Sequence, residues 1–162
     1  MKKVKMVLRE LHRSENGLAR MLLTIADRHR VDHEVFHVAR DIAQWSQIHV
    51  HEIAEVGRNH GLRLDPVPTG GAPAVVERLA QRTSVLLGRR PEPGLMLLAD
   101  LRRLHRKAAG VSLDWELLGQ SAQATQRRDL LELSQRCHPQ TLRQMRWANA
   151  QLKQVAPQVL AS

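Results

Sequence analysis

Apolar residues recur every three or four positions through most of the chain, with polar residues between them. This spacing is typical of amphipathic helices, whose apolar side chains share one face. In the first sixty residues the pattern predicts two helices, with apolar positions at Val4, Leu8, Leu11, Leu18, Leu22, Ile25, Val35, Ala39, Ile42, Ile53 and Val56. Asp32 is a suitable N-cap for the second helix, and Gly61 is a suitable C-cap glycine. Two helices joined by so short a turn must form an antiparallel hairpin.

The segment that follows the first hairpin reads as a crossover rather than a continuation of it. Residues 61–93 contain most of the prolines and several glycines of the chain. Such residues interrupt regular structure. A short helix is expected inside the crossover, from about residue 74 to residue 87, and a second hairpin is expected after it.

The second hairpin is predicted with less regular boundaries. A third long helix is expected from about residue 97 to Gly110, and a fourth from its N-cap Ser112 through Leu133. Pro139 should end or bend the fourth helix, because proline lacks the donor that an interior helical position needs. A final helix is expected from Leu142 to just before Pro157. The sequence therefore predicts an all-α bundle of two long hairpins plus a C-terminal helix, as one domain over residues 1–162.

Composition excludes several other classes of protein. Of 162 residues, 2% are aromatic and none is tyrosine, which argues against an all-β fold and against nucleic-acid modules that stack bases on rings. The single cysteine, Cys137, can form neither an internal disulfide nor a zinc knuckle and is interpreted as a small buried hydrophobe. No apolar stretch is long enough for a signal peptide or a membrane span, so a cytoplasmic protein is expected.

Three polar residues interrupt the apolar faces of the first hairpin. Glu15 lies between Leu11 and Leu18, while Ser46 and His49 lie between Ile42 and Ile53. With the turn near residue 31, Glu15 should face the second helix between Ser46 and His49. Because a lone buried carboxylate costs several kcal/mol, these three residues should be partners in a buried polar cluster.

Two further residues extend this pattern. His12 lies three residues before Glu15, and Glu52 lies three residues after His49. Residues at this spacing share a helix face, so two histidines and two acids are expected at one level of the hairpin.

This arrangement resembles half of the di-iron site of the ferritin-like superfamily. In that family one helix supplies a Glu and the next a carboxylate-x-x-His pair. Glu15 would match the first acid and His49 the histidine, whereas the acid position of the pair holds Ser46. Asp129-x-x-Glu132 is the closest analogue in the second half of the chain, and the third helix lacks an acid on its apolar face.

The resemblance implies a ferritin-like bundle with an incomplete site. Such a site would hold a single iron, manganese or zinc ion through Glu15, His49, His12 and Glu52. The alternative is a non-enzymatic scaffold or interaction protein in which Glu15, Ser46 and His49 form a structural hydrogen-bonded cluster. No catalytic residue is assigned.

The charge of the chain supports a further alternative. Lys and Arg number 25 against 16 Asp and Glu, for a formal net charge of +9. A surface of this charge attracts DNA and other polyanions without sequence preference. A homodimer through exposed helix faces is also expected from the amphipathic pattern, and no membrane partner is expected.

Overall fold

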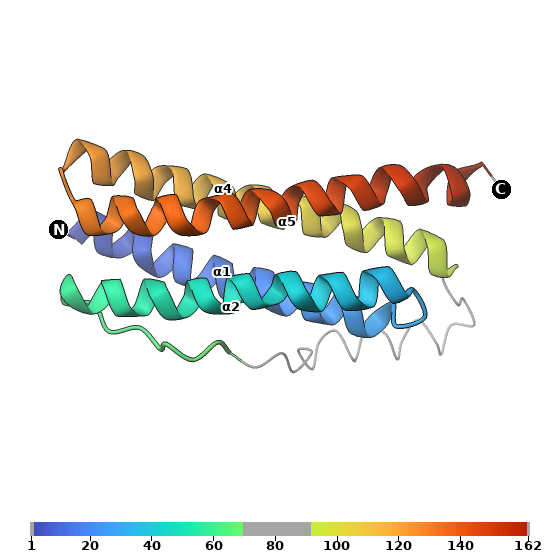
Figure 1. Cartoon of the computed structure of the whole chain (residues 1–162), viewed down its shortest axis with the longest axis horizontal. Coiled ribbons are helices and arrows are strands. Elements are labelled where there is room, and N and C mark those ends of the chain that lie inside the picture. Colours follow the sequence, from blue (N-terminus) through green and yellow to red (C-terminus); the bar gives the residue numbers. More distant parts are fainter. Residues whose placement is uncertain (1, 70–91, 162) are drawn as a thin grey trace.

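The computed structural model of the chain describes residues 2–69 and 92–161, and Figure 1 shows their arrangement. These residues form four helices and no strand: α1 (Lys2–Arg28), α2 (His33–Asn59), α4 (Pro93–Ala124) and α5 (Arg128–Leu160). The expected all-α bundle is therefore confirmed. The short helix expected at residues 74–87 lies outside the described residues.

The first hairpin has the predicted boundaries. The Asp32 side chain accepts a hydrogen bond from the Val35 backbone N–H at 3.0 Å, as an N-cap residue does. At the other end of α2, Gly61 has a φ of +64° and the Leu62 N–H bonds to the Gly57 carbonyl at 2.9 Å. This left-handed position favours glycine, so the prediction of Gly61 as the C-cap glycine is confirmed.

Helix α4 corrects the boundaries predicted for the second hairpin. It continues through Gly110, and Ser112 lies inside the helix, where its hydroxyl lies 2.8 Å from the His138 Nε2 atom. Val111 and Trp115 are both buried, so the apolar face continues without a break across Gly110. Packing of that face outweighs the cost of a glycine inside a helix, which is about 1 kcal/mol relative to alanine. The turn to the last helix falls at Gln126, whose φ is +53°.

Helix α5 corrects two further expectations. It contains Pro139 and extends past Pro157 to Leu160, so the predicted C-terminal helix is the second half of α5. Leu133, assigned to the preceding helix, lies on α5. An interior proline costs a helix about 3 kcal/mol. The helix nevertheless continues, because buried residues on both sides of Pro139, from Leu130 to Ala148, pack one face of α5 into the core. Pro139 itself is exposed and lies off that face.

Each helix packs against two neighbours around a common core. Contacts join α1 to α2, α4 to α5, α1 to α4 and α2 to α5, and Figure 1 shows the hairpin of α1 and α2 beside the hairpin of α4 and α5. The fully buried core residues include Leu8, Leu11, Leu18, Leu22, Ile53, Leu101, Leu104, Trp115, Leu118, Leu130 and Leu133. No helix among the described residues is long and apolar enough to cross a membrane.

Gly110 provides a test of the continuous α4 helix. A Cβ atom added there would meet nothing within 4 Å, whereas a Cβ on Gly94 would meet a Val159 methyl at 2.6 Å. We expect Gly110→Ala to raise the free energy of unfolding by about 0.5–1 kcal/mol, because alanine loses less backbone entropy. Urea unfolding of dilute protein measures this, with Gly94→Ala as the destabilised control. A Gly110→Ala variant less stable than the wild type would contradict an uninterrupted helix.

Candidate functional site

One oxygen of Glu15 is the meeting point of all four helices. Glu15 lies on α1 and is fully buried. Its Oε1 atom accepts hydrogen bonds from three donors: the His49 Nδ1–H at 2.9 Å, the Trp115 Nε1–H at 2.6 Å and the Thr141 hydroxyl at 3.2 Å. These donors belong to α2, α4 and α5. The predicted contact between Glu15 and His49 is confirmed, and two further helices contribute to the same atom.

His49 is the basic partner of Glu15. Burial lowers the pKa of His49, but the hydrogen bond and the negative charge of Glu15 together raise it more, so the pKa lies above its ordinary value of 6.5. The Nε2–H donates to the Gln140 Oε1 atom at 2.7 Å. Both ring nitrogens therefore face oxygen acceptors, as an imidazolium requires, and the Trp115 ring lies edge-on at 5.7 Å between centroids.

Ser46 belongs to the same buried layer but has a different partner from the one predicted. Its hydroxyl oxygen accepts a hydrogen bond from the Gln144 Nε2–H at 2.9 Å, and the same amide donates to the Ile42 carbonyl at 2.8 Å. Ser46 thus joins α2 to α5 rather than to Glu15. We call the residues of this level the polar layer: Glu15, Ser46, His49, Trp115, Gln140, Thr141 and Gln144.

Four members of the polar layer were not predicted as site residues. Gln140, Thr141 and Gln144 follow Pro139, and the expectation of a helix boundary there hid the face that they share. Thr141 and Gln144 are spaced i,i+3, so a prediction of one continuous helix across Pro139 would have placed them on the same face. Both are fully buried in the structure. Trp115 reads as an apolar core residue, and its indole N–H gives no sequence signal.

His12 and Glu52 do not converge with Glu15 and His49. The His12 Nε2 atom lies 2.7 Å from the Asp65 carbonyl oxygen, and Glu52 accepts a hydrogen bond from the Arg136 guanidinium at 3.0 Å. Across the described ranges, no three or more His, Cys, Asp and Glu side chains are grouped so as to hold a metal ion. Of the four residues expected to form one metal site, Glu15 and His49 therefore lie together, whereas His12 and Glu52 have other partners.

Asp129 and Glu132 lie at the beginning of α5, away from the polar layer. Asp129 accepts a hydrogen bond from His60 at 2.7 Å, and Glu132 pairs with Arg128 on the surface at 2.8 Å. The position that Asp129-x-x-Glu132 was expected to fill is taken by Thr141-x-x-Gln144, because α5 is one long helix and its middle faces α2.

Cys137 lies close to Glu52 but is not a reactive thiol. Burial raises the pKa of Cys137 strongly, and the charge of Glu52, whose Oε2 atom lies 3.6 Å from the sulfur, raises it further. The protonated thiol is a poor nucleophile, so its surroundings agree with the interpretation of Cys137 as a small buried hydrophobe.

A second buried acid joins the two hairpins near the turn between α1 and α2. Asp100 on α4 accepts hydrogen bonds from Arg28 at 2.7 Å and from His29 at 2.8 Å. Burial raises the pKa of Asp100, but these two partners lower it more, so its pKa lies below the ordinary value of 3.8. The contribution of the Asp100–Arg28 ion pair to stability is therefore complete above pH 3.8, and it is lost as the pH falls through the lowered pKa of Asp100.

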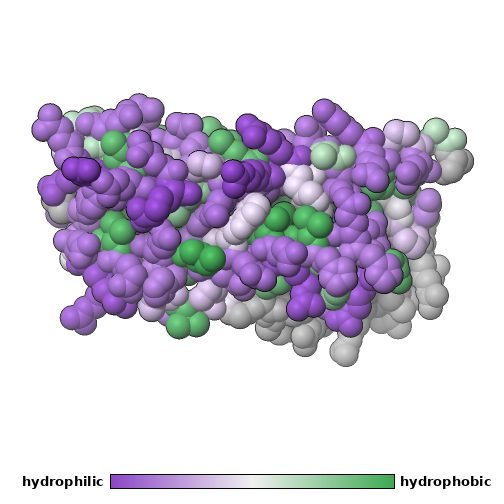
Figure 2. Space-filling view, viewed as in Figure 1, coloured by the Kyte–Doolittle hydropathy of each residue, from purple (hydrophilic) through white to green (hydrophobic). Residues whose placement is uncertain are grey.

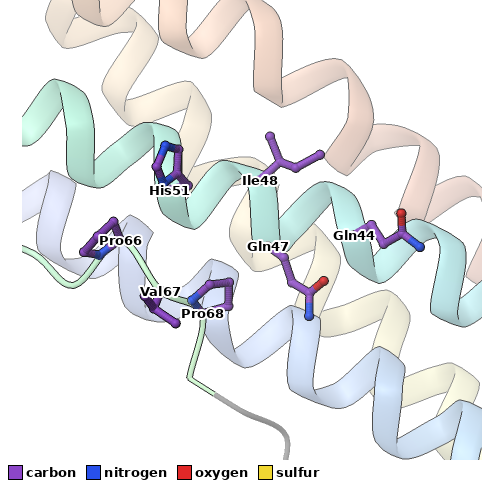
Figure 3. A pocket seen from close by; sticks show the side chains of 7 residues that line it. All are labelled: Gln44, Gln47, Ile48, His51, Pro66, Val67 and Pro68. Atoms are coloured by element: carbon purple, nitrogen blue, oxygen red, sulfur yellow. The ribbon is translucent and has the colours of Figure 1, made fainter.

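An open apolar groove runs along the outer side of α2. Its volume is about 650 Å³, and Figure 3 shows its lining residues: Gln44, Gln47, Ile48 and His51 from α2, and Pro66, Val67 and Pro68 from the segment that follows it. Among the described residues no Asp, Glu, Lys or Arg side chain lines the groove, so these residues offer apolar, amide and imidazole contacts.

Comparisons with protein-family models, with curated proteins and with solved structures found no match to this chain.

The Glu15–His49 pair gives a direct prediction for titration. We expect the His49 ring to titrate above pH 6.5, and Glu15→Gln to lower its midpoint, because burial then acts without the opposing charge. By linkage, the contribution of His49 to stability is complete below pH 6.5 and is lost as the pH rises through its raised pKa. NMR of the histidine ring resonances measures the midpoint.

A control separates the local effect from a general change in charge. Glu55→Gln removes a surface carboxylate of α2, the helix that carries His49. Glu55 pairs with Arg58. The Glu55→Gln variant should leave the His49 midpoint unchanged. An equal shift in both variants would contradict a specific Glu15–His49 pair.

Proposed function

We propose that the chain is a non-enzymatic helical scaffold with a ferritin-like arrangement, and that its polar layer fixes the register of the four helices. The observation that carries the proposal is the Glu15 Oε1 atom, which accepts hydrogen bonds from α2, α4 and α5 at once. A carboxylate that ties every helix of a bundle to one level acts as a structural anchor.

The order and direction of the helices support the ferritin-like arrangement. That fold has two antiparallel hairpins and one long connection between them. Here α2 ends beside the beginning of α5, as the His60–Asp129 bond shows, and α4 begins beside the end of α1, as the Arg28–Asp100 bond shows. The end of α2 and the beginning of α4 therefore lie at opposite ends of the bundle, as a long connection between two hairpins requires.

The side chains at the ferritin-like positions support a structural role for this level. Glu15 and His49 are residue types that the family uses, whereas Ser46, Thr141 and Gln144 stand at the positions of the remaining acid-x-x-His members. Hydroxyl and amide groups at these positions bond within the layer. This donor set does not fit a two-metal centre, which needs several carboxylates.

The physical consequence of the layer is a single register. A shift of one helix by one turn, about 5.4 Å, would remove the partners of Glu15 and leave a buried charge uncompensated. Each buried polar atom that loses its hydrogen-bond partner destabilises the shifted alignment by about 1–3 kcal/mol. The layer therefore favours one alignment of the hairpins over others with equally apolar cores.

A double-mutant cycle tests the structural role. We expect Glu15→Leu or His49→Leu alone to lower the free energy of unfolding by about 3–5 kcal/mol, because each strands the other buried group. The double variant should lose less than the sum of the two, since both partners are then apolar. Urea unfolding measures the cycle, and the NMR amide spectrum reports whether a single register persists. Strict additivity would contradict the proposal.

A single bound metal ion is the second candidate function, and one observation favours it. The Glu15 Oε2 atom is buried and has no hydrogen-bond partner among the described residues, so a second oxygen of this carboxylate is available beside His49. An imidazole and a carboxylate would suit zinc, iron or manganese. Binding through His49 requires the neutral ring, so a metal must compete with the proton that Glu15 stabilises.

Elemental analysis of untagged protein tests this candidate. If the site is used, protein from cultures supplemented with iron, manganese or zinc should contain about one metal ion per chain at pH 8 and less at pH 6. Glu15→Gln should abolish retention, while the surface variant Glu55→Gln retains it. Less than about a tenth of an equivalent under all of these conditions would overturn the metal candidate and leave the scaffold proposal standing.

A further inference from the structure

Helix α4 carries a second apolar stripe on the side that faces away from the core. Its members are Leu95, Ala99, Arg102, Arg106, Gly110, Leu113 and Leu117; all seven are exposed, and two arginines interrupt the apolar positions. We call these seven residues the outer face of α4. Their steps of four, three, four, four, three and four residues place them on one side of the helix, the spacing of a helix-pairing seam.

The outer face of α4 exposes more large apolar surface than any other described element. Leu95, Leu113 and Leu117 are 48%, 65% and 60% exposed, whereas α1, α2 and α5 each carry one exposed large apolar residue. Figure 2 shows the face of the molecule on which α2 and α5 lie in front. On that face hydrophilic residues surround separate apolar patches. An apolar seam on a helix that already buries its other face indicates a second packing partner.

Gly110 lies in the middle of this face and has no intramolecular reason to lack a side chain. The other glycines inside the described helices have a heavy atom within 3.5 Å of an added Cβ, whereas Gly110 has none within 4 Å. An interior glycine costs a helix about 1 kcal/mol relative to alanine. Because Gly110 has no side chain, there is room for a side chain of another molecule to approach the α4 backbone closely.

The charges of the outer face select its partner. Arg102 and Arg106 lie on the N-terminal side of Gly110, and neither makes an ion pair in the part of the chain that the structure describes. Glu116 flanks the outer face on the C-terminal side, beside Leu117; it is half-exposed, and its carboxylate lies 3.8 Å from the His138 Nδ1 atom. A parallel copy of α4 would place Arg against Arg, whereas an antiparallel copy places Arg106 level with Leu117 and Glu116. The face is therefore complementary to itself in the antiparallel direction.

We infer that the part of the outer face of α4 from Arg106 to Leu117 forms an antiparallel homodimer with the same part of a second copy. Leu113 of each copy packs over Gly110 of the other, as a knob fills a hole. The apolar stem of Arg106 covers Leu117 of the second copy, and its guanidinium pairs with Glu116 there. The interface is symmetric, so each contact occurs twice. This inference is independent of the role of the polar layer.

Sedimentation velocity of the full chain over about 5–200 µM tests the dimer. In about 0.15 M salt, where long-range repulsion between the basic chains is screened, the wild type should dimerise. Leu113→Glu should weaken the dimer about tenfold or more, because it removes a central apolar contact and adds a charge. Leu160→Glu is the matched control, since Leu160 is 69% exposed on α5, and it should leave the dimer unchanged.

A charge exchange identifies the second copy as the partner. Arg106→Glu and Glu116→Arg should each weaken the dimer, because each places like charges opposite one another. The double variant Arg106→Glu, Glu116→Arg should restore it to within about threefold of the wild type. Gly110→Ala should raise the stability of the monomer and weaken the dimer.

Three results would overturn the inference. The first is a wild type that stays monomeric over the whole range, including one that instead binds DNA or an acidic protein through Arg102 and Arg106. The second is a dimer that Leu113→Glu leaves unaffected. The third is a double charge variant no stronger than either single variant. All substituted residues except Gly110 have exposed side chains, and unchanged circular dichroism at low concentration confirms that each variant is folded.

Discussion

The carboxylate of Glu15 is fully buried, and the arrangement of the bundle follows from the need to compensate its charge. A buried, unpartnered carboxylate is strongly destabilising, so the fold must bring donors to it. His49 supplies the opposite charge, and Trp115 and Thr141 supply further donors from the second hairpin. The apolar core determines that four helices pack together. In the scaffold that we propose, the geometry of this one carboxylate determines the level at which they do so.

Side-chain hydrogen bonds also join the hairpins at both ends of the bundle. Asp100 joins α4 to the end of α1 through Arg28 and His29, and Asp129 joins α5 to the end of α2 through His60. Both contacts connect one hairpin to the other. Together with the polar layer at the centre, they place polar contacts between the hairpins at three levels along the bundle. Apolar packing alone is tolerant of sliding, whereas these directional contacts are not.

Helix α4 differs from its neighbours because both of its sides have apolar residues. Its inner side packs Leu101, Leu104 and Trp115 into the core, and its outer side exposes Leu113 and Leu117. A scaffold that holds its own register through a buried layer can use an outer helix face for assembly without altering that layer. The two proposals thus concern separate surfaces of one helix, and each can fail without the other.

The helical hairpin, its caps and the Glu15–His49 contact could be predicted from sequence because they depend on local spacing: three or four residues between buried positions, and a turn too short for any other path. The length of α4 and α5 could not, because Gly110 and Pro139 favour interruption locally and only packing on both sides of them keeps each helix whole. For the same reason Trp115, Thr141 and Gln144 became visible as partners only in three dimensions. The sequence by itself determined that Glu15, Ser46 and His49 had to be buried. The tertiary structure decided which groups compensate them, because those groups lie about a hundred residues away and reach Glu15 or Ser46 only when the second hairpin packs against the first.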